Sequence, residues 1–377
     1  MKIGILRESI PDEKRVVLLP EIVPSFQDLK CEVWVEEKAG EKAFIKDQAY
    51  TKDGAEIKKE DEIISGCDVI FKINPLEKEE IEKMKEGQVV LAAFNPFFNK
   101  EIVEKLVSKK ITSFSLDSVP RITRAQSMDI LSSMATIAGY KAVLEAARLL
   151  PAFFPMFMSA AGTIKPAKIL ILGAGVAGLQ AIATSRKLGA VVEVFDVRSA
   201  VKEEVMSLGG KFIEVEGARE DAAAGGYAVE QTDDFKEKQQ QLIHDHAVKS
   251  DVVVCTAQIP GKPAPLLIKK ETVDAMQPGS VIIDLAASTG GNCEVTKNNE
   301  IISHEGVTVV GKSNFPSEMP VDASRMFGKN VLNFFKLLTD EEGKLKLDFE
   351  DEVVRGTCLT HDGEIVQERI KNFYNQQ

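Results

Sequence analysis

Residues 168–198 read KILILGAGVAGLQAIATSRKLGAVVEVFDVR, and this stretch decides the fold prediction. A short apolar run leads into Gly173, Gly175 and Gly178, which stand at G-x-G-x-x-G spacing. A helix-like segment follows the glycines, and a second apolar run ends on Asp196. A strand, a glycine turn, a helix and a second strand in this order predict a parallel β-α-β unit that binds a dinucleotide.

The glycines each meet a physical need of a loop that holds a pyrophosphate. Gly173 permits the tight turn, Gly175 lets a phosphate approach the backbone, and Gly178 lets the helix pack closely on the strand. The N-terminus of the helix adds N–H groups and a partial positive charge. Asp196 predicts bonds to the adenosine ribose hydroxyls, whereas Arg198 is a residue type that can hold a 2′-phosphate. Because the carboxylate stands at the strand end itself, we predict NAD(H) as the cofactor.

Composition narrows the class of protein. The 377 residues are 44% hydrophobic and 28% charged, which is typical of a globular protein of two or three domains. The net charge of −11 and the lack of a basic patch with interleaved aromatics predict no nucleic-acid partner. No run of about 18 uninterrupted apolar residues occurs, so we predict no direct membrane insertion. Five cysteines without C-x-x-C spacing and four scattered histidines predict reduced thiols, no metal site and a cytoplasmic location.

Strand-like and helix-like segments alternate through both halves of the chain. In the first half, strands are expected at Lys2–Leu6, Glu32–Glu36, Val69–Ile73, Val89–Phe94 and Ile111–Ser115. In the second half, they are expected at Ile169–Leu172, Val191–Phe195, Asp251–Thr256, Val281–Asp284 and Val307–Gly311. The alternation predicts an α/β protein of two doubly wound, Rossmann-like domains with mainly parallel sheets, joined by long helices.

The expected domain boundaries follow from this pattern. The first α/β domain is discontinuous and comprises residues 1–126 plus 322–377, and the NAD-binding Rossmann domain comprises residues 166–321. Residues 127–165 form the connection between them. It starts with one long helix from Ser127 to Leu150, ended by a proline. A second amphipathic helix, residues 322–338, crosses back to the first domain. The tail is expected to form short strands around an Asp362-Gly363 turn, namely KLKLDF, EVVRGTCLT and HDGEIV.

The segment PRITRAQSMD, residues 120–129, gathers polar side chains at the predicted domain junction. It carries Arg121, Arg124, Gln126 and Asp129 within ten residues. A nicotinamide carboxamide could bond to Gln126, with Arg121 and Asp129 fixing its orientation as a charged pair. The alternative is a solvated turn in which the aspartate favours the N-terminus of the next helix.

Two further loops are candidates for nucleotide contacts. TAQIPGKPAP, residues 256–265, follows a strand end, so Gln258 and Ile259 would line the adenine or the ribose unless the segment is a plain turn. The polar insertion Glu214–Gln241 contains Gly226 and Tyr227. Its length predicts a lid over the cofactor, and the alternative is a surface helix that starts at Asp233.

Taken together, these motifs resemble the NAD(H)-binding component, domain I, of the proton-translocating nicotinamide nucleotide transhydrogenases. The chain looks like the separate first α-subunit of enzymes whose α-chain is split, and the similarity covers nearly its whole length. The stretches that carry it are Arg121–Gly139, Gly173–Leu188, Phe195–Arg198, Ala224–Ala228 and Thr256–Pro265.

The resemblance implies roles for individual residues. Arg121, Gln126 and Asp129 would hold the nicotinamide and its ribose beside the reacting atoms. Asp196 to Arg198 would hold the adenosine ribose, and the loop of Gly226 and Tyr227 would fold over bound nucleotide. The remaining implied cofactor contacts come from both halves of the chain: Ser127, Met128, Ser132, Gly173, Ala174, Gly175, Val176, Gly178, Val197, Gln239, Gln258 and Ile259.

The resemblance also implies a reaction and partners. NADH bound here would pass a hydride directly to NADP⁺ on an NADP(H)-binding partner, and a membrane-spanning component would couple this step to proton translocation. The chain would be a homodimer, attached peripherally to the cytoplasmic membrane through those partners. Positioning supplies the catalysis, because neither ring exchanges a proton with a side chain.

The alternative is an alanine dehydrogenase, because Arg15 and Lys72 match positions that bind the keto acid there. That family uses a histidine in the loop after the fourth strand, where residues 92–96 of this chain read AAFNP. A non-catalytic NAD-sensing module is a third class. Such a module would bind NAD through the Rossmann features alone and would have no use for Arg121, Gln126 and Asp129, since it carries out no reaction at the nicotinamide.

Overall fold

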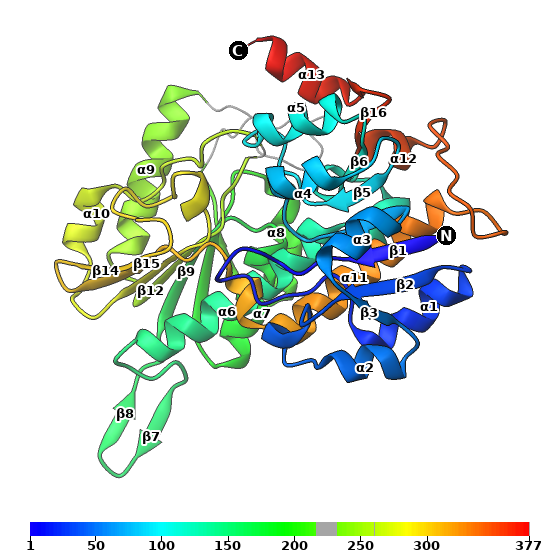
Figure 1. Cartoon of the computed structure of the whole chain (residues 1–377). Coiled ribbons are helices and arrows are strands. Elements are labelled where there is room, and N and C mark those ends of the chain that lie inside the picture. Colours follow the sequence, from blue (N-terminus) through cyan, green and yellow to red (C-terminus); the bar gives the residue numbers. More distant parts are fainter. Residues whose placement is uncertain (216–231, 260, 377) are drawn as a thin grey trace. The chain divides into compact units, whose positions relative to one another are not determined.

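Two compact units make up the chain in the computed structural model. The model describes residues 1–215, 232–259 and 261–376. Unit 1 comprises residues 1–134 and 316–377, and unit 2 comprises residues 135–315. Helix α6 (Ile130–Leu149) therefore begins in unit 1 and ends in unit 2 (Figure 1). The segment 127–165, expected as the connection, is divided between the units after Met134.

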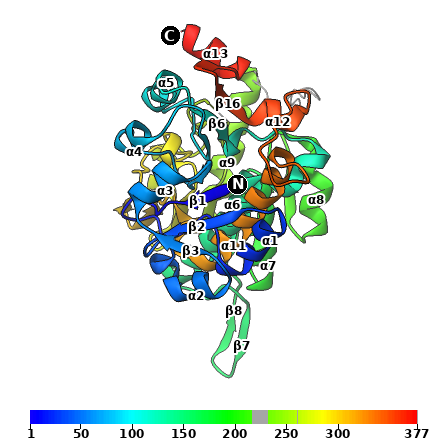
Figure 2. The same ribbon diagram turned by 45° about the vertical axis from the view of Figure 1, so that its right-hand side comes forward.

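Unit 1 is built on an eight-stranded sheet. The strand order is β3 (Glu56–Lys58), β2 (Glu32–Glu36), β1 (Lys2–Ile5), β4 (Val69–Phe71), β5 (Val89–Ala92), β6 (Thr112–Ser115), β16 (Cys358–His361) and β17 (Glu364–Ile365). The first six strands run parallel, and the last two pair antiparallel. Figure 2 shows β1, β2 and β3 side by side. The helices of this unit are α1 (Val23–Asp28), α2 (Asp47–Lys52), α3 (Glu60–Gly66), α4 (Lys78–Lys83), α5 (Lys100–Ser108), α11 (Pro320–Phe335), α12 (Glu352–Thr357) and α13 (Glu368–Asn375).

Two apolar cores cover the two faces of this sheet. Successive strand residues point to opposite faces, so Ile3 belongs to one core, whereas Ile70 of the neighbouring strand belongs to the other. Helix α11 completes the first core from the far end of the sequence. The ring of Phe335 lies 5.4 Å from Phe26 and 5.3 Å from Phe71, centroid to centroid. The discontinuous unit is therefore held together by contacts between residues far apart in sequence rather than by its N-terminal part alone.

Unit 2 is a Rossmann domain. Its strand order is β11 (Lys211–Ile213), β10 (Val191–Phe195), β9 (Lys168–Leu172), β12 (Val252–Cys255), β13 (Val281–Asp284), β15 (Val307–Val310) and β14 (Ile301–His304). All strands except antiparallel β14 run in the same direction. Its helices besides α6 are α7 (Val176–Lys187), α8 (Lys202–Ser207), α9 (Asp233–Ala247) and α10 (Lys270–Ala275). The direction of winding reverses between β9 and β12, where ligands bind in such sheets.

Both units thus confirm the predicted fold class, an α/β protein of two doubly wound domains with mainly parallel sheets. Helix α11 and the Asp362-Gly363 turn are also confirmed, since both turn residues have positive φ, 48° and 79°. A hairpin of β7 (Phe157–Ser159) and β8 (Gly162–Ile164) projects from unit 2 (Figure 1). This hairpin was not predicted.

Three details of the sequence prediction were wrong. The long helix starts at Ile130 rather than Ser127, because the Asp129 side chain accepts bonds from Ser132 and ends the preceding turn. KLKLDF forms no strand, apart from one isolated bridge at Leu345. The first part of EVVRGTCLT is helix α12, because the Asp351 carboxylate caps it.

Candidate functional site

The three glycines of the loop after β9 differ in their surroundings. Gly173 has a φ of +101°, and a Cβ there would lie 2.6 Å from Thr256 Oγ1. A Cβ at Gly178 would lie 1.9 Å from the carbonyl oxygen of Gly173. A Cβ at Gly175, whose φ is −77°, would meet no heavy atom within 4 Å. Two glycines are therefore required by turn geometry and close packing, and Gly175 faces open space.

That open space lies at the N-terminus of helix α7. Gly175 is the N-cap residue, and its position supplies no side-chain acceptor for the first N–H groups of the helix. The first turn of any helix leaves such N–H groups without helical partners, and the helix dipole adds positive potential there. Space, unpaired donors and positive potential coincide here, so the loop fits a phosphate-bearing ligand.

Asp196, at the end of β10, ties the glycine loop to the neighbouring strand. Its Oδ2 accepts the Ala174 N–H at 2.7 Å and Arg198 Nη2 at 2.7 Å. Its Oδ1 accepts the backbone N–H and Nε of Arg198, each at 2.9 Å. The ion pair raises the pKa of the Arg198 guanidinium. A carboxylate offers about four lone-pair positions, so a hydroxyl that bonds to Asp196 must replace or share one of these donors.

A small apolar hollow adjoins Asp196. It is lined mainly by aromatic and aliphatic side chains from β10, the segment around β11 and the first turn of α9: Phe195, Val197, Phe212, Val215 and Phe235. Gln239 lies further along α9 and is buried. The Thr232 hydroxyl accepts the Phe235 N–H and caps this helix, so a helix does start at Asp233, as the alternative to a lid expected. Gly226 and Tyr227, the expected lid, lie outside the described residues.

The loop after β12 starts against the glycine loop. Thr256 Oγ1 donates to the carbonyl oxygens of Leu172 and Gly173, at 3.1 and 3.0 Å. Gln258 is exposed, and its Nε2 donates to the Leu285 carbonyl at 3.1 Å. Ile259 is half-buried. Thus the carboxyl edge of β9, β10 and β12 brings the glycine loop, Asp196 and Thr256 together.

The other group of candidate residues lies in unit 1. Arg121 precedes η4 (Thr123–Met128), which carries Gln126, Ser127 and the buried Met128. The side chains of Arg121, Gln126 and Ser127 are exposed. Asp129 Oδ1 accepts the Ser132 N–H at 2.9 Å, and its Oδ2 accepts the Ser132 hydroxyl at 2.6 Å. The helix-capping alternative for this aspartate is therefore confirmed, and the same geometry fixes the carboxylate in place.

Long-range contacts hold η4 in position. Arg124 makes a bidentate ion pair with Asp351, with N–O distances of 2.7 and 2.8 Å. These bonds, with N–H bonds from α12, lower the pKa of Asp351 to about 2. Asn330 and Asn333 of α11 both donate to the Ser127 carbonyl. Arg124 is thus a support for the loop that carries Arg121 and Gln126.

Sequence reasoning missed two residues that shape the site in unit 2. A Cβ at Gly139 of α6 would lie 2.1 Å from the Ala177 carbonyl, so only glycine lets α6 approach the first turn of α7. Thr256 fixes the start of the β12 loop, as described above. Nothing local distinguishes either residue from an ordinary helix or strand-end position, because both act on segments far away in sequence.

Among the described residues, no cluster of three or more His, Cys, Asp or Glu side chains could hold a metal ion. Within the same ranges, no helix has the length and apolar character needed to cross a bilayer. The five cysteines are buried and unpaired.

The chain resembles known proteins over nearly its whole length. Residues 4–138 match the family model "Alanine dehydrogenase/PNT, N-terminal domain", and residues 142–368 match the C-terminal domain model. The chain is 48% identical to the first part of the split NAD(P) transhydrogenase subunit alpha of Rhodospirillum rubrum, with 97% of this chain and 98% of the relative covered. An alanine dehydrogenase of Methanococcus maripaludis is 28% identical over the full chain and 97% of its own length. Among solved structures, a transhydrogenase from Sinorhizobium meliloti superposes with a TM-score of 0.86 at 39% identity, covering 98% of this chain and all of that one.

Proposed function

Because the chain belongs to the alanine dehydrogenase/PNT family, we propose that it is the NAD(H)-binding component of a proton-translocating transhydrogenase. In this role, NADH bound here reduces NADP⁺ bound on a partner component by direct hydride transfer. The observation that carries the proposal is the open cradle at Gly175, at the switch point of a Rossmann sheet. It occurs in a chain that shares 48% identity and nearly its full length with a transhydrogenase subunit.

The residues divide the work of holding NAD(H). The glycine loop and the first turn of α7 would bind the pyrophosphate, and Asp196 would bind the adenosine ribose in exchange for contacts with Arg198. The adenine base would lie at the small hollow beside Asp196, which would have to widen to admit it. Arg121, Gln126 and Asp129 would orient the nicotinamide and its ribose. The bound cofactor supplies the hydride itself.

The charges around Arg15 and Lys72 favour this function over an alanine dehydrogenase. Arg15 donates through Nε and Nη2 to the Glu13 carboxylate, at 2.7 and 2.5 Å. Lys72 is fully buried, and its Nζ lies 2.7 Å from both carboxylate oxygens of Glu80. Each cation that would hold a keto acid is therefore already paired with a carboxylate, and a keto acid would have to displace it.

The partners follow from the same family assignment. We propose an NADP(H)-binding component and a membrane-spanning component, with this chain attached peripherally to the cytoplasmic membrane through them. The R. rubrum relative is itself named as one portion of an α-subunit. Coupling to proton translocation would reside in the membrane-spanning partner.

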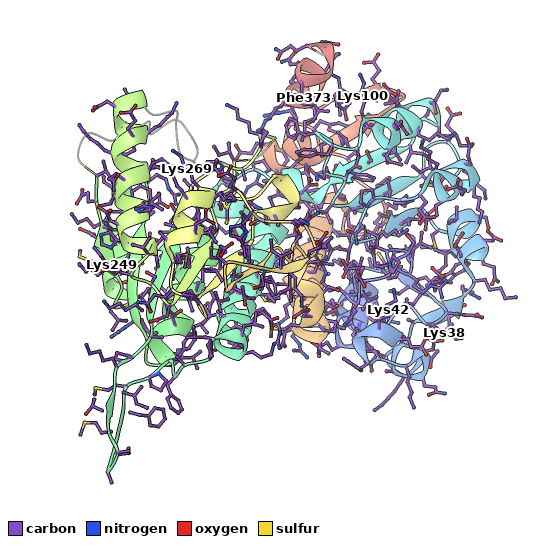
Figure 3. The ribbon with its side chains drawn as sticks, turned by 90° about the vertical axis from the view of Figure 1, so that its left-hand side faces the viewer. Lys38, Lys42, Lys100, Lys249, Lys269 and Phe373 are labelled. Atoms are coloured by element: carbon purple, nitrogen blue, oxygen red, sulfur yellow. The ribbon has the colours of Figure 1, made fainter. Side chains whose placement is uncertain are left out.

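The hairpin β7–β8 supports the proposed homodimer. Phe157, Met158 and Ile164 of the hairpin are 45%, 74% and 47% exposed, and Phe153 and Met156 beside it are 50% and 58% exposed. Figure 3 shows the hairpin side chains standing clear of the rest of unit 2. An exposed apolar patch of this kind marks an association surface, and a second copy of the chain is the occupant we propose. Met158→Lys should shift the sedimentation of the chain from dimer toward monomer.

The central experiment uses the full chain with an NADP(H)-binding component. NADH should bind to the chain alone, as measured by NADH fluorescence, and the mixture should reduce an NAD analogue at the expense of NADPH. Pyruvate with ammonium should cause no NADH oxidation by the chain alone. Sustained oxidation with these substrates would contradict the proposal and establish the dehydrogenase.

One variant tests the loop of unit 1 separately. Asp129→Asn keeps a good helix cap but removes the negative charge, so the fold should persist while the rate of the mixed reaction falls. Asp340→Asn is the matched control, because Asp340 also accepts backbone N–H groups, from Glu342 and Lys344, in a turn of unit 1. Equal rates for both variants would refute the role of Asp129.

A further inference from the structure

Asn292 is a buried polar residue that none of the nucleotide roles above includes. It follows β13 in unit 2 and has no exposed surface. Its Oδ1 accepts the Ala257 N–H at 3.0 Å, and its Nδ2 donates to the carbonyl oxygens of Ala257 and Pro265, at 2.9 and 2.8 Å. One amide side chain therefore holds both ends of the loop from Ala257 to Pro265.

Asn292 is itself fixed by its surroundings. Its N–H donates to Asp284 Oδ2 at 2.8 Å, and its carbonyl oxygen accepts the N–H groups of Leu267 and Ile268. Asp284 is also buried and accepts the Cys293 N–H and the Thr296 hydroxyl through the same oxygen. A network in which every member is hydrogen-bonded is rigid, so the amide is a fixed reference point for the loop.

The held loop adjoins the glycine loop. Thr256, immediately before Ala257, donates to the carbonyl oxygen of Gly173. Gln258 and Ile259 are the next residues, and we place them beside the nucleotide. The position of these two residues relative to the glycine loop therefore depends on the bonds between Asn292 and Ala257.

We propose that Asn292 is a positioning residue for the NAD(H) site, acting through the loop Ala257–Pro265 without touching the nucleotide. The inference rests on the proposed function, in that it requires NAD(H) to bind at this edge. Asn292→Asp keeps the volume of the side chain but replaces two N–H donors by an oxygen that faces two carbonyl oxygens. The loop ends then repel the side chain, and the loop leaves its position against the glycine loop.

The chain offers a matched control in unit 1. The side chain of Gln88 is buried and makes the same three kinds of bond. Its Nε2 donates to the carbonyl oxygens of Ile64 and Cys67, and its Oε1 accepts the Lys85 N–H. Gln88→Glu thus makes the same chemical change in a buried backbone clamp that borders no nucleotide loop.

The test compares NADH binding to wild type, Asn292→Asp and Gln88→Glu in the full chain, at a temperature where circular dichroism shows all three folded. Asn292→Asp should raise the Kd for NADH at least about fivefold, as expected when one ordinary hydrogen bond's stabilisation is lost. Gln88→Glu should leave Kd unchanged. In the reconstituted reaction, the KM for NADH should rise with kcat little changed. Amide exchange at Ala257 should quicken in nucleotide-free Asn292→Asp.

The outcomes separate the two proposals. A wild-type chain that fails to bind NADH contradicts the proposed function. Wild-type binding with an unchanged Kd for Asn292→Asp overturns the positioning role, and so does an equal loss of affinity in Gln88→Glu. If Asn292→Asp does not fold, Asn292→Ser provides the second variant, because its shorter side chain gives up the bonds to Ala257 and Pro265 without placing an extra oxygen against their carbonyl groups. An unchanged Kd for that variant then overturns the inference.

Discussion

Substituting Gly175 and Gly178 by alanine should separate nucleotide binding from stability. A methyl group at Gly175 enters open space on a backbone with an ordinary φ of −77°. Alanine lowers the conformational entropy of the unfolded chain, which stabilises the folded protein by about 0.4–1 kcal/mol. Alanine is also a poorer N-cap residue than glycine, which destabilises the folded protein by a similar amount. The free energy of unfolding should therefore change by less than about 1 kcal/mol. The methyl group nevertheless occupies the place where the pyrophosphate would meet the backbone.

Gly178→Ala should behave in the opposite way. Its methyl group would lie 1.9 Å from the Gly173 carbonyl, well inside the 3.0 Å that Cβ contacts respect. Overpacking of this kind costs about 1–3 kcal/mol, and the better helix propensity of alanine recovers only about 1 kcal/mol. We expect a measurable loss of stability, with weaker NADH binding as a consequence of the shifted loop.

The assay needs a probe for each unit. The single tryptophan, Trp34, lies on β2 and reports unfolding of unit 1. Circular dichroism reports both units together, so a change in its signal that Trp34 fluorescence does not share reports unfolding of unit 2. NADH fluorescence gives the Kd. Losing one charge-assisted bond, worth about 1.5–3 kcal/mol, should raise the Kd of Gly175→Ala by about 10- to 150-fold. Wild-type affinity in Gly175→Ala would refute the assignment of the pyrophosphate to this loop. A Gly175→Ala chain that does not fold would show that the space beside Gly175 cannot accept a methyl group.

Three further outcomes are expected. Asp196→Asn should weaken NADH binding by about tenfold. It should also narrow the preference of the chain for NADH over NADPH, because Arg198 is released from its ion pair. Fluorescence titration with both nucleotides measures this preference, and an unchanged preference argues against the role of Asp196. Burial raises the pKa of Glu8 from 4.5 to about 7. Between about pH 5 and 7 the folded unit 1 therefore holds a proton that the unfolded chain releases, so the stability of unit 1 should fall as the pH rises, by up to about 1.4 kcal/mol per pH unit. Glu8→Gln should flatten that slope in denaturation followed by Trp34; a slope that persists excludes Glu8 as its source. Arg124→Gln should lower the stability of unit 1 by no more than about 1 kcal/mol at about pH 7, and the loss should shrink as the pH falls toward 2 and Asp351, whose pKa is about 2, takes up a proton.

The sequence predicted those features that depend on local pattern. The glycine spacing and the apolar runs around it located β9 and β10 to within one residue and predicted a helix, α7, between them. Alternation of strands and helices predicted the parallel sheets for the same reason. Strands β3 and β11 escaped prediction, since each is a short edge strand without the continuous apolar run of β4, which was predicted.

The features that the sequence did not predict depend on distant partners. Arg121 and Arg124 stand three residues apart in a similar context, yet Arg124 pairs with Asp351, 227 residues away. The support of Ser127 by Asn330 spans 203 residues. The clamp at Asn292 likewise joins two loops that no spacing rule connects. Such contacts follow from the packed fold, so composition and spacing carry no trace of them.

The interrupted course of unit 1 has a consequence for its synthesis. Strand β16 pairs with β6, and Phe335 fills the core beside Phe26, but both arrive only after all of unit 2 has been translated. Unit 2 is continuous, so it can complete its sheet on the ribosome while unit 1 still lacks an edge and part of its core. The nascent N-terminal sheet must wait, with apolar surface uncovered, while the roughly 180 residues of unit 2 are added. Chains released before α11 should therefore carry a folded nucleotide-binding unit and an N-terminal segment that proteases cut readily.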